Sequence, residues 1–266
     1  MPPASALRAH IEAFLAERVP HASDFRPALA PEMVPTGIAE VDQFTGGGVP
    51  RGCLTELCGA ASTGRTTLLI SLLAQVTDRG EAAALIDVTD AFDPEFAASA
   101  GVRLESLLWV RCGGGSNRDA KHKWGVEARI EQALKIADWL LQAGGFSVIA
   151  LDMAGVPPRL ARRIPLTSWF RFRRAVENTA TAFVLIEQQP YAKTCASLVL
   201  KMTRSEVNWS AVQPGESPPA QNPTTLLKEI AFNAELMRSR IGAAEARRPM
   251  ATAFTAESGW NIRNVS

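Results

Sequence analysis

The sequence predicts an α/β fold in which a largely parallel central sheet is flanked by helices and continues into antiparallel strands toward the C-terminus. Apolar strand-like runs alternate with helical segments from Cys53 to Asp152, which is typical of a parallel sheet. The last apolar runs follow one another with only loops between them, which favours antiparallel pairs. The 266 residues, 47% hydrophobic and 21% charged, suit one α/β domain, and this composition excludes a disordered, collagen-like or coiled-coil protein.

The N-terminal segment is expected to be an appendage to this domain. Apolar residues recur at helical spacing within residues 5–17, and Pro20 follows them, which predicts a short helix on a linker. We therefore expect an N-terminal helix and linker over residues 1–32 and one core domain over residues 33–266.

The strands of the core are expected at short apolar runs, and its helices at longer segments with a helical period. In chain order, we expect a strand over 53–58, a helix over 66–78, a strand over 82–87, a helix that begins at Asp93 and Pro94, a strand over 107–110, a helix over 126–142, a strand over 146–152, a helix near 165–178, and strands over 182–188, 197–202, 230–241 and 252–260. Four prolines within residues 213–225 predict an exposed loop there.

Charge, cysteines and hydropathy exclude several classes of protein. Lys and Arg number 28 and Asp and Glu 27, so no diffuse basic surface for nucleic acid or anionic membranes is expected. The four cysteines form no CxxC pair and the three histidines are scattered, which argues against a zinc site. No secretory leader and no apolar run of bilayer length is found, so we expect a cytoplasmic protein without a membrane partner.

Residues 59–66 have the pattern of a phosphate-binding loop, because they follow an apolar strand and open a helix. In such a loop, backbone N–H groups and the helix N-terminus cradle phosphates, while a hydroxyl holds Mg²⁺. Asp152, at the end of a second apolar strand, supplies a carboxylate for the Mg²⁺ shell, although alone it could merely cap its strand. The predicted ATP-binding residues are Gly59, Gly64, Arg65, Thr66, Thr67 and Asp152, with Thr66 and Asp152 as the Mg²⁺ ligands.

Arg65 stands where this loop normally has lysine. Lysine carries a compact point charge that can fold back along the loop, whereas a guanidinium is planar and bulkier, so the exchange is not conservative. The residues thus favour descent from a phosphate-loop protein and leave ATP binding open.

Further residues carry a family resemblance: Pro35-Thr36-Gly37, Asp42, Gly46-Gly47-Gly48, Pro50-Arg51-Gly52, Ile86-Asp87 and Asp93-Pro94. Together with the loop, they resemble the ATPase core of RecA-like recombinases from about residue 33 to Trp260. The run over residues 46–57 is also similar to RecA-related ImuA-type accessory proteins of mutagenic translesion synthesis.

The resemblance implies phosphate contacts over residues 59–67 and a Mg²⁺-associated carboxylate at Asp152. In active members, a glutamate two residues after a strand aspartate positions the attacking water, and Thr89 occupies that place here. Threonine cannot act as that base. Since Arg65 and Thr89 both depart from the catalytic pattern, we expect little or no ATP hydrolysis, with Asp90 as the base only if the chain is a working ATPase.

Two more features follow from the resemblance. Gln188 matches the family's nucleotide-sensing glutamine, but the second DNA loop, over residues 189–196, is short, which puts strand exchange in doubt. Arg238 and Arg240 match a basic pair that reaches ATP on a neighbouring subunit, which implies a homo-oligomer. The alternative is two exposed basic residues on one face of a strand.

An arginine cluster without acidic residues lies over residues 157–174, where the resemblance places the first DNA loop. Its members are Arg159, Arg162, Arg163, Arg171, Arg173 and Arg174. Guanidinium groups neutralise phosphates, so DNA, more specifically single-stranded DNA, or an acidic repair protein is the expected partner. Trp169, Phe170 and Phe172 could stack on unpaired bases, but packing into the core is the favoured interpretation.

The sequence therefore predicts a RecA-fold accessory protein of DNA repair or of the damage-induced (SOS) translesion response. It is expected to bind DNA or a repair partner such as a recombinase or a translesion polymerase, and to retain ATP and Mg²⁺ only in a degenerate site. Two alternatives stay open: an active DNA-dependent ATPase recombinase, and a nucleotide-free scaffold that recruits a polymerase or a recombinase.

Overall fold

The computed structural model describes residues 31–112, 125–209, 227–240 and 251–257, all of which belong to one compact unit. The predictions of a helix over residues 5–17 and of a loop over residues 213–225 lie outside the described residues. The division of the chain at residues 32 and 33 stays a prediction.

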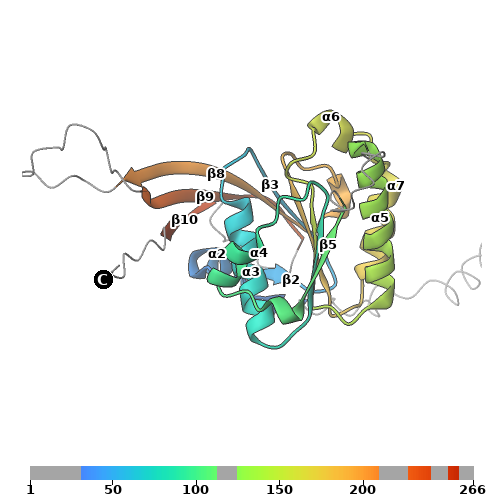
Figure 1. The fold of residues 1–266 in the computed structure, drawn as a ribbon, viewed down its shortest axis with the longest axis horizontal. Helices are drawn as coiled ribbons and strands as arrows, with labels where there is room; N and C mark the ends of the chain where they lie inside the picture. The colour runs from blue at the N-terminus through green and yellow to red at the C-terminus, as the bar shows by residue number, and fades with distance from the viewer. Residues whose placement is uncertain (1–30, 113–124, 210–226, 241–250, 258–266) are drawn as a thin grey trace, which may run out of the picture. The chain divides into compact units, whose positions relative to one another are not determined.

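A mixed sheet forms the centre of this unit (Figure 1). Its strands are β3 (Leu54–Gly59), β4 (Ala83–Asp87), β5 (Leu107–Arg111), β6 (Val148–Asp152), β7 (Ala182–Glu187), β8 (Leu198–Trp209), β9 (Leu227–Ser239) and β10 (Ala251–Glu257). They lie in the order β10-β9-β8-β3-β7-β6-β4-β5. The strands from β8 to β5 pair in parallel, whereas β9 pairs antiparallel with β8 and β10 with β9. The predicted fold class is confirmed.

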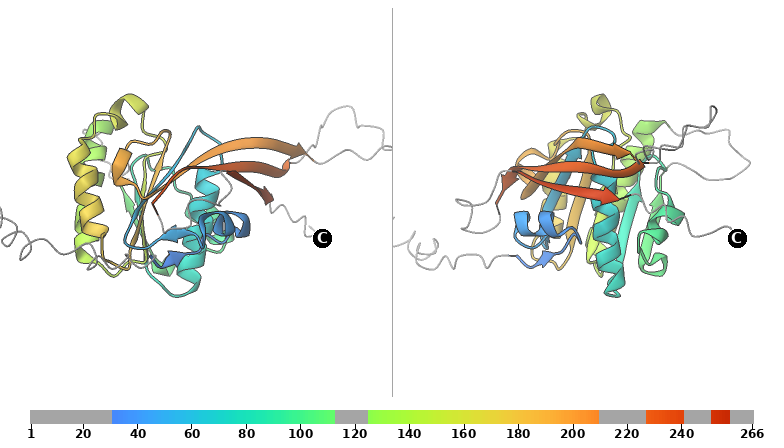
Figure 2. Two further views of the ribbon diagram at one scale, coloured as in Figure 1. Left: turned by 180° about the vertical axis from the view of Figure 1, so that it is seen from behind. Right: turned by 90° about the vertical axis from the view of Figure 1, so that its left-hand side faces the viewer.

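Helices cover both faces of the parallel part of the sheet (Figures 1 and 2). On one face lie α2 (Ala39–Thr45), α3 (Arg65–Asp78) and α4 (Pro94–Ser99), and on the other α5 (Val126–Ala143) and α7 (Leu166–Val176). Along β6, Val148 and Ala150 pack into the core under α3, while Ile149 and Leu151 pack into the core under α5 and α7. Burial on both faces explains the unbroken apolar runs that predicted these strands.

Several short elements were not predicted. They are β1 (Met33–Val34) and β2 (Val49–Pro50), which pair antiparallel, the helix α2 between them, the helix α6 (Pro158–Ala161), and the 3-10 turns η2 (Leu104–Ser106) and η3 (Lys193–Cys195). Asp42 fixes the start of α2, because its Oδ1 accepts hydrogen bonds from both the backbone N–H and the hydroxyl of Thr36 at 2.7 Å. None of the described helices is long and apolar enough to cross a membrane.

The three C-terminal strands form a ribbon that extends beyond the helix-covered part of the sheet (Figures 1 and 2). β8 continues to Trp209, seven residues past the predicted end at Met202. Phe232 on β9 and Phe254 on β10 are buried, with ring centroids 5.4 Å apart, and belong to the core that also contains α3. The ribbon is therefore anchored to the phosphate-loop side of the sheet.

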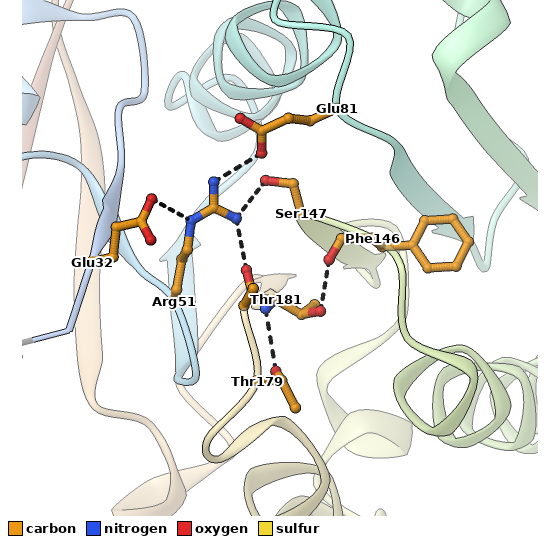
Figure 3. Close-up of polar contacts among 8 residues, drawn as sticks. Glu32, Arg51, Glu81, Phe146, Ser147, Thr179 and Thr181 are labelled. Carbon is orange, nitrogen blue, oxygen red and sulfur yellow. Dashed lines mark hydrogen bonds and ion pairs between the residues drawn. The ribbon is translucent and has the colours of Figure 1, made fainter.

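Arg51 joins four segments at the amino ends of the parallel strands (Figure 3). Its guanidinium donates to Glu81 Oε2 and Ser147 Oγ at 2.8 Å, to the carbonyl of Ala180 at 2.7 Å, and to Glu32 Oε1 at 3.2 Å. The side chain is only 11% exposed, so these contacts replace water and fix the edge of the sheet opposite the phosphate loop.

Candidate functional site

The phosphate loop connects β3 to α3 without a side-chain cap on the N-terminus of the helix. Ser62 and Gly64 have positive φ values of 58° and 85°, and the Thr63 hydroxyl donates to the carbonyl of Ala60 at 2.8 Å. No side chain caps α3, so the first N–H groups of this helix remain directed at the loop. Such a helix start favours anions such as phosphate.

The side chain of Arg65 is directed into the protein. It is 6% exposed, and its Nη1 donates to the backbone carbonyl of Glu187 at 2.5 Å. Burial lowers the pKa of the guanidinium, while the nearby carboxylate of Asp152 raises it. A phosphate-loop lysine offers its charge to phosphates. The guanidinium of Arg65 instead joins the start of α3 to the end of β7.

Two aspartates lie side by side where β4 and β6 end, since Asp87 and Asp152 are paired in register. Asp87 accepts hydrogen bonds from the backbone N–H groups of Thr89 at 3.2 Å and Phe92 at 2.9 Å. Asp152 accepts one from Ala154 N at 2.8 Å. Burial raises the pKa of Asp152 to about 6, and Asp87 adds to this effect, while the Ala154 hydrogen bond and Arg65 oppose it.

Thr66, Asp152 and Thr89 line one pocket of about 130 Å³, and the assignment of Thr66 and Asp152 as Mg²⁺ ligands stays a prediction. A hydroxyl and a carboxylate are oxygen donors of the kind that Mg²⁺ takes, so these two residues fit the ion. Thr89 is packed on Gly155, where an added Cβ would lie 2.8 Å from Thr89 Oγ1. The pocket is smaller than the roughly 300 to 1,000 Å³ of small-molecule sites, so it suits a metal ion with part of a phosphate.

Phe96 on α4 was not identified from the sequence. It lines the same pocket and is 55% exposed, and an exposed aromatic face can stack on a nucleobase. Its position on the first turn of a short helix after Asp93 and Pro94 was visible in the sequence, but its exposure depends on how α4 packs.

Asp90, the base of the active-ATPase alternative, is engaged elsewhere. Its two carboxylate oxygens accept hydrogen bonds from Arg111 Nε and Nη2 at 2.7 and 2.8 Å. The bond to Arg111 lowers the pKa of Asp90. Asp90 is not among the described residues that line the pocket of Thr66, Thr89 and Asp152.

Gln188 connects the end of β7 to the segment after β6. Its Nε2 donates to the carbonyls of Ala154 at 3.0 Å and Val156 at 3.2 Å. Because Ala154 also lines the Thr66 pocket, this amide is placed to respond to that pocket. Its assignment as a nucleotide sensor stays a prediction.

Arg238 and Arg240 contact their own chain. The Arg238 guanidinium donates to the carbonyl of Lys193, and Arg240 Nη1 donates to the carbonyl of Thr194 at 3.0 Å. Both contacts tie the end of β9 to η3. The predicted action of this pair on a neighbouring subunit would require these contacts to open.

The six predicted DNA-binding arginines divide into two groups. Arg159, Arg162 and Arg163 are exposed at and after α6, near the carboxyl ends of the strands. Arg162 donates to Gln189 Oε1 at 2.7 Å, and with Arg163 it lines a pocket of about 590 Å³. The other three lie on α7: Arg171, Arg173 and Arg174.

The second group is partly neutralised. Arg171 Nε lies 3.0 Å from Asp138 Oδ1 on α5, and Arg173 is half-buried. By contrast, the side chains of Arg159, Arg163 and Arg174 make no hydrogen bond or ion pair within the part of the chain that the structure describes. The six arginines are therefore not equally available to a ligand.

The aromatic residues of this segment have different environments. Trp169 and Phe172 are 1% and 0% exposed, and their ring centroids lie 6.0 Å apart in an edge-to-face arrangement. The packing interpretation is confirmed for these two. It is wrong for Phe170, which is 40% exposed, because this side of α7 is not covered by the sheet.

Comparison with known proteins identifies relatives of this chain. Residues 22–161, more than half of the chain, match the RecA N-terminal domain. The chain is 33% identical over 175 residues to protein RecA of Herpetosiphon aurantiacus, which covers 60% of this chain and 45% of that protein. It is 36% identical over 172 residues to protein RecA of Aquifex aeolicus, covering 59% and 46% of the two chains.

The match to protein RecA of Methylococcus capsulatus is shorter, with 36% identity over 130 residues, or 48% of this chain and 33% of that protein. The chain thus spans less than half the length of these relatives. The fold, the phosphate loop and the matched N-terminal domain together show that this chain belongs to the RecA family.

Proposed function

We propose that this chain is a RecA-fold accessory protein of DNA repair that binds single-stranded DNA and hydrolyses little or no ATP. The observation that carries the proposal is the buried Arg65, whose guanidinium is bound to the carbonyl of Glu187. Phosphoryl transfer depends on positioned positive charge and on a residue that orients the attacking water. In this site, the guanidinium of Arg65 is bound to a backbone carbonyl, and Thr89 occupies the place of the residue that orients water.

The chain's own residues would still hold a nucleotide loosely. The N–H groups at the start of α3 would bind phosphate oxygens, and Thr66 and Asp152 would hold Mg²⁺. Bound Mg²⁺ would supply neutralisation of the phosphate charge. Thr89 has no ionisable proton acceptor and packs on Gly155, so it would not activate water.

The alternative of an active DNA-dependent ATPase has less support. It requires a base near Asp152, and Asp90 is instead held by two hydrogen bonds from Arg111. Breaking this exposed pair would cost little, but Asp90 would also have to change its backbone direction from a φ of 60°.

Exposed arginines without intramolecular partners support DNA as the ligand. Arg163 and Lys193 line the 590 Å³ pocket, and Arg159 is exposed on α6, just before Arg163 in the chain. Unpaired guanidinium groups can bind phosphates without first breaking an internal ion pair.

Titration of a labelled single-stranded oligonucleotide at several salt concentrations tests this part of the proposal. The double substitution Arg159→Ala and Arg163→Ala is expected to weaken binding several-fold and to reduce the salt slope by about 0.7 for each phosphate that these arginines neutralise. Arg171→Ala serves as the control, because Asp138 already pairs with Arg171. Unchanged binding in the double variant would favour the nucleotide-free scaffold that recruits a polymerase or a recombinase.

The finer proposal is a role in damage-induced translesion mutagenesis, supported by the similarity of residues 46–57 to ImuA-type proteins. Deletion of the gene should then lower the frequency of mutations induced by ultraviolet light and leave homologous recombination intact. A loss of recombination with normal induced mutagenesis would contradict this role and favour the recombinase alternative.

A further inference from the structure

Two carboxyl groups lie buried beside each other under the segment that follows β7. Glu56 on β3 and Glu187 at the end of β7 are both 0% exposed. Cys58 lies two residues after Glu56 on β3, so the two side chains point to the same face of the sheet. Glu187 on β7 is paired in register with Cys58 and therefore projects from this face as well. This face is the one covered by α5 and α7.

The two carboxyl groups share a backbone donor. The N–H of Tyr191 donates to Glu56 Oε1 at 2.7 Å and to Glu187 Oε2 at 3.2 Å. The N–H of Ala192 adds a second bond to Glu56 Oε1 at 2.7 Å. The Glu56–Glu187 pair therefore holds the start of the 189–195 segment against the sheet.

Each carboxyl group has one oxygen left without a partner. Glu56 Oε2 and Glu187 Oε1 are buried and accept no hydrogen bond from any residue that the structure describes. Two ionised carboxylates in this position would repel each other, and each would leave a buried charge unsatisfied. A single proton carried by the pair would remove one of the two buried charges and with it the repulsion.

No cation forms an ion pair with these carboxyl groups within the described residues. Around them lie the thiols of Cys58 and Cys195 and the hydroxyl of Tyr191. The guanidinium of Arg238 lowers the pKa of Glu56, and its effect is the weakest of those identified. The Arg65 guanidinium binds the backbone carbonyl of Glu187, not its carboxyl group.

We infer that Glu56 and Glu187 share one proton at neutral pH, and that this proton fastens the 189–195 segment to the sheet. The segment carries Gln189, Tyr191 and Lys193, which line the 590 Å³ pocket, and its η3 turn receives Arg238 and Arg240. Loss of the proton loosens this wall of the pocket, so the pair couples pH to the geometry of the arginine-lined surface.

Burial raises the pKa of both carboxyl groups, because it disfavours their charged forms. It raises the pKa of Glu56, and it raises the pKa of Glu187 further, with the charge of Glu56 as the next cause. A carboxyl group whose pKa is raised in the folded state stabilises the fold at low pH and loses this contribution as the pH rises through its folded pKa.

Infrared spectroscopy of the whole protein at neutral pH tests the shared proton directly. The wild type should show the carbonyl band of one protonated buried carboxyl group. Both Glu187→Gln and Glu56→Gln should abolish the band, because the remaining carboxylate can accept a bond from the new amide. Absence of the band in the wild type, or a band that persists in either variant, would overturn the inference.

The pH dependence of unfolding gives a second readout. From about pH 7 upward, where most of Asp152 is ionised because its pKa is about 6, the unfolding constant of the wild type should rise about tenfold per pH unit faster than that of Glu187→Gln, until the pair releases its proton. Glu131→Gln, an exposed carboxylate on α5, is the control and should retain the wild-type slope. Equal slopes in the wild type and Glu187→Gln would contradict a proton held by the pair.

Amide hydrogen exchange over residues 189–195 tests whether the proton fastens this segment to the sheet. After correction for intrinsic exchange, protection of Tyr191 and Ala192 should fall with rising pH in the wild type and stay constant in Glu187→Gln. Protection that is independent of pH in both proteins would show that the proton does not hold this segment.

Discussion

Asp152 illustrates how the environment of one residue changes the chemistry of a predicted ligand. Its carboxyl group ends β6 beside Asp87, and burial is the main reason that its pKa rises from 3.8 to about 6. Mg²⁺ binds the ionised form, so ion binding and protonation compete at this residue. The site is thus less prepared for a metal ion at acidic pH than an exposed aspartate would be.

Substitution of Asp152 by asparagine should remove a pH dependence of stability. The raised pKa means that the folded protein keeps a proton which the unfolded chain has lost, so stability falls as the pH rises from 3.8 to about 6. At about 1.4 kcal/mol per pKa unit, the loss is on the order of 3 kcal/mol. Urea unfolding across this range should show the loss in the wild type, and Asp152→Asn should give a flatter profile. A parallel profile in the variant would exclude Asp152 as its source.

Arg65 should contribute to stability without any nucleotide. Replacement by alanine removes a charged donor from the buried carbonyl of Glu187, which we expect to lower the free energy of unfolding by about 2 kcal/mol. Arg79→Ala, at the exposed end of the same helix, should change it little. Denaturant unfolding in nucleotide-free buffer measures both. Wild-type stability of Arg65→Ala would mean that the guanidinium does not serve the fold.

At the scale of elements, the C-terminal ribbon covers part of the phosphate loop. A Cβ atom added to Gly64 would lie 2.7 Å from Phe232 Cγ, so the ring of Phe232 lies directly on the loop backbone. Because Phe232 belongs to β9, movement of the ribbon and opening of the loop are linked through this contact.

Comparison of two glycine substitutions isolates this contact. Gly64 and Gly80 both have positive φ values, 85° and 72°, but no atom lies within 4 Å of a Cβ added to Gly80. Gly80→Ala should lose only the backbone term of about 1 to 2 kcal/mol, whereas Gly64→Ala should lose about 1 to 3 kcal/mol more through overpacking. Thermal or denaturant unfolding measures the difference. Equal losses would show that Phe232 does not press on the loop.

The amino edge of the sheet depends on Arg51. Its partners come from the loops before β1, between α3 and β4, before β6 and before β7. Arg51→Ala leaves several of them without a donor, so we expect a loss of about 2 to 4 kcal/mol in the free energy of unfolding. Arg103→Ala, which breaks an exposed pair with Asp78, should have little effect. Similar stabilities of the two variants would contradict the structural role of Arg51.

The helices and strands that could be predicted are those whose pattern lies within a few consecutive residues of the sequence. Strands β3, β4, β6 and β7 are buried on both faces and appear as apolar runs, and the loop before α3 follows a known spacing. Residues 203–209 of β8 are mostly exposed and polar, so only their pairing with β9 reveals a strand. The seven residues of α2 are too few to establish a helical period.

The candidate phosphate-binding site also combines features that a short stretch of sequence predicts with features that depend on tertiary packing. Thr66 and Asp152 follow strand ends that could be located in the sequence, and the structure brings them to one pocket. The direction of Arg65, the exposure of Phe96 and the meeting of Glu56 with Glu187 depend on packing between distant segments. No spacing along the chain predicts these contacts.

For the whole molecule, the near-zero net charge of +1 conceals local separation. Arg159, Arg162 and Arg163 are exposed around α6, while the acidic side chains Glu56, Asp87, Asp152 and Glu187 are buried at the ends or in the interior of neighbouring strands. The exposed charge on and directly after α6 is thus positive although the total is near zero, which is the arrangement that a polyanion would meet.

The central claim is that this member of the RecA family keeps the frame of a phosphate-loop ATPase without its catalysis. Steady-state ATP hydrolysis with Mg²⁺ and single-stranded DNA tests it most directly, with Asp152→Asn as the reference for background. We predict that the wild type shows no DNA-stimulated hydrolysis above that of Asp152→Asn. DNA-dependent turnover in the wild type that Asp152→Asn abolishes would contradict the account.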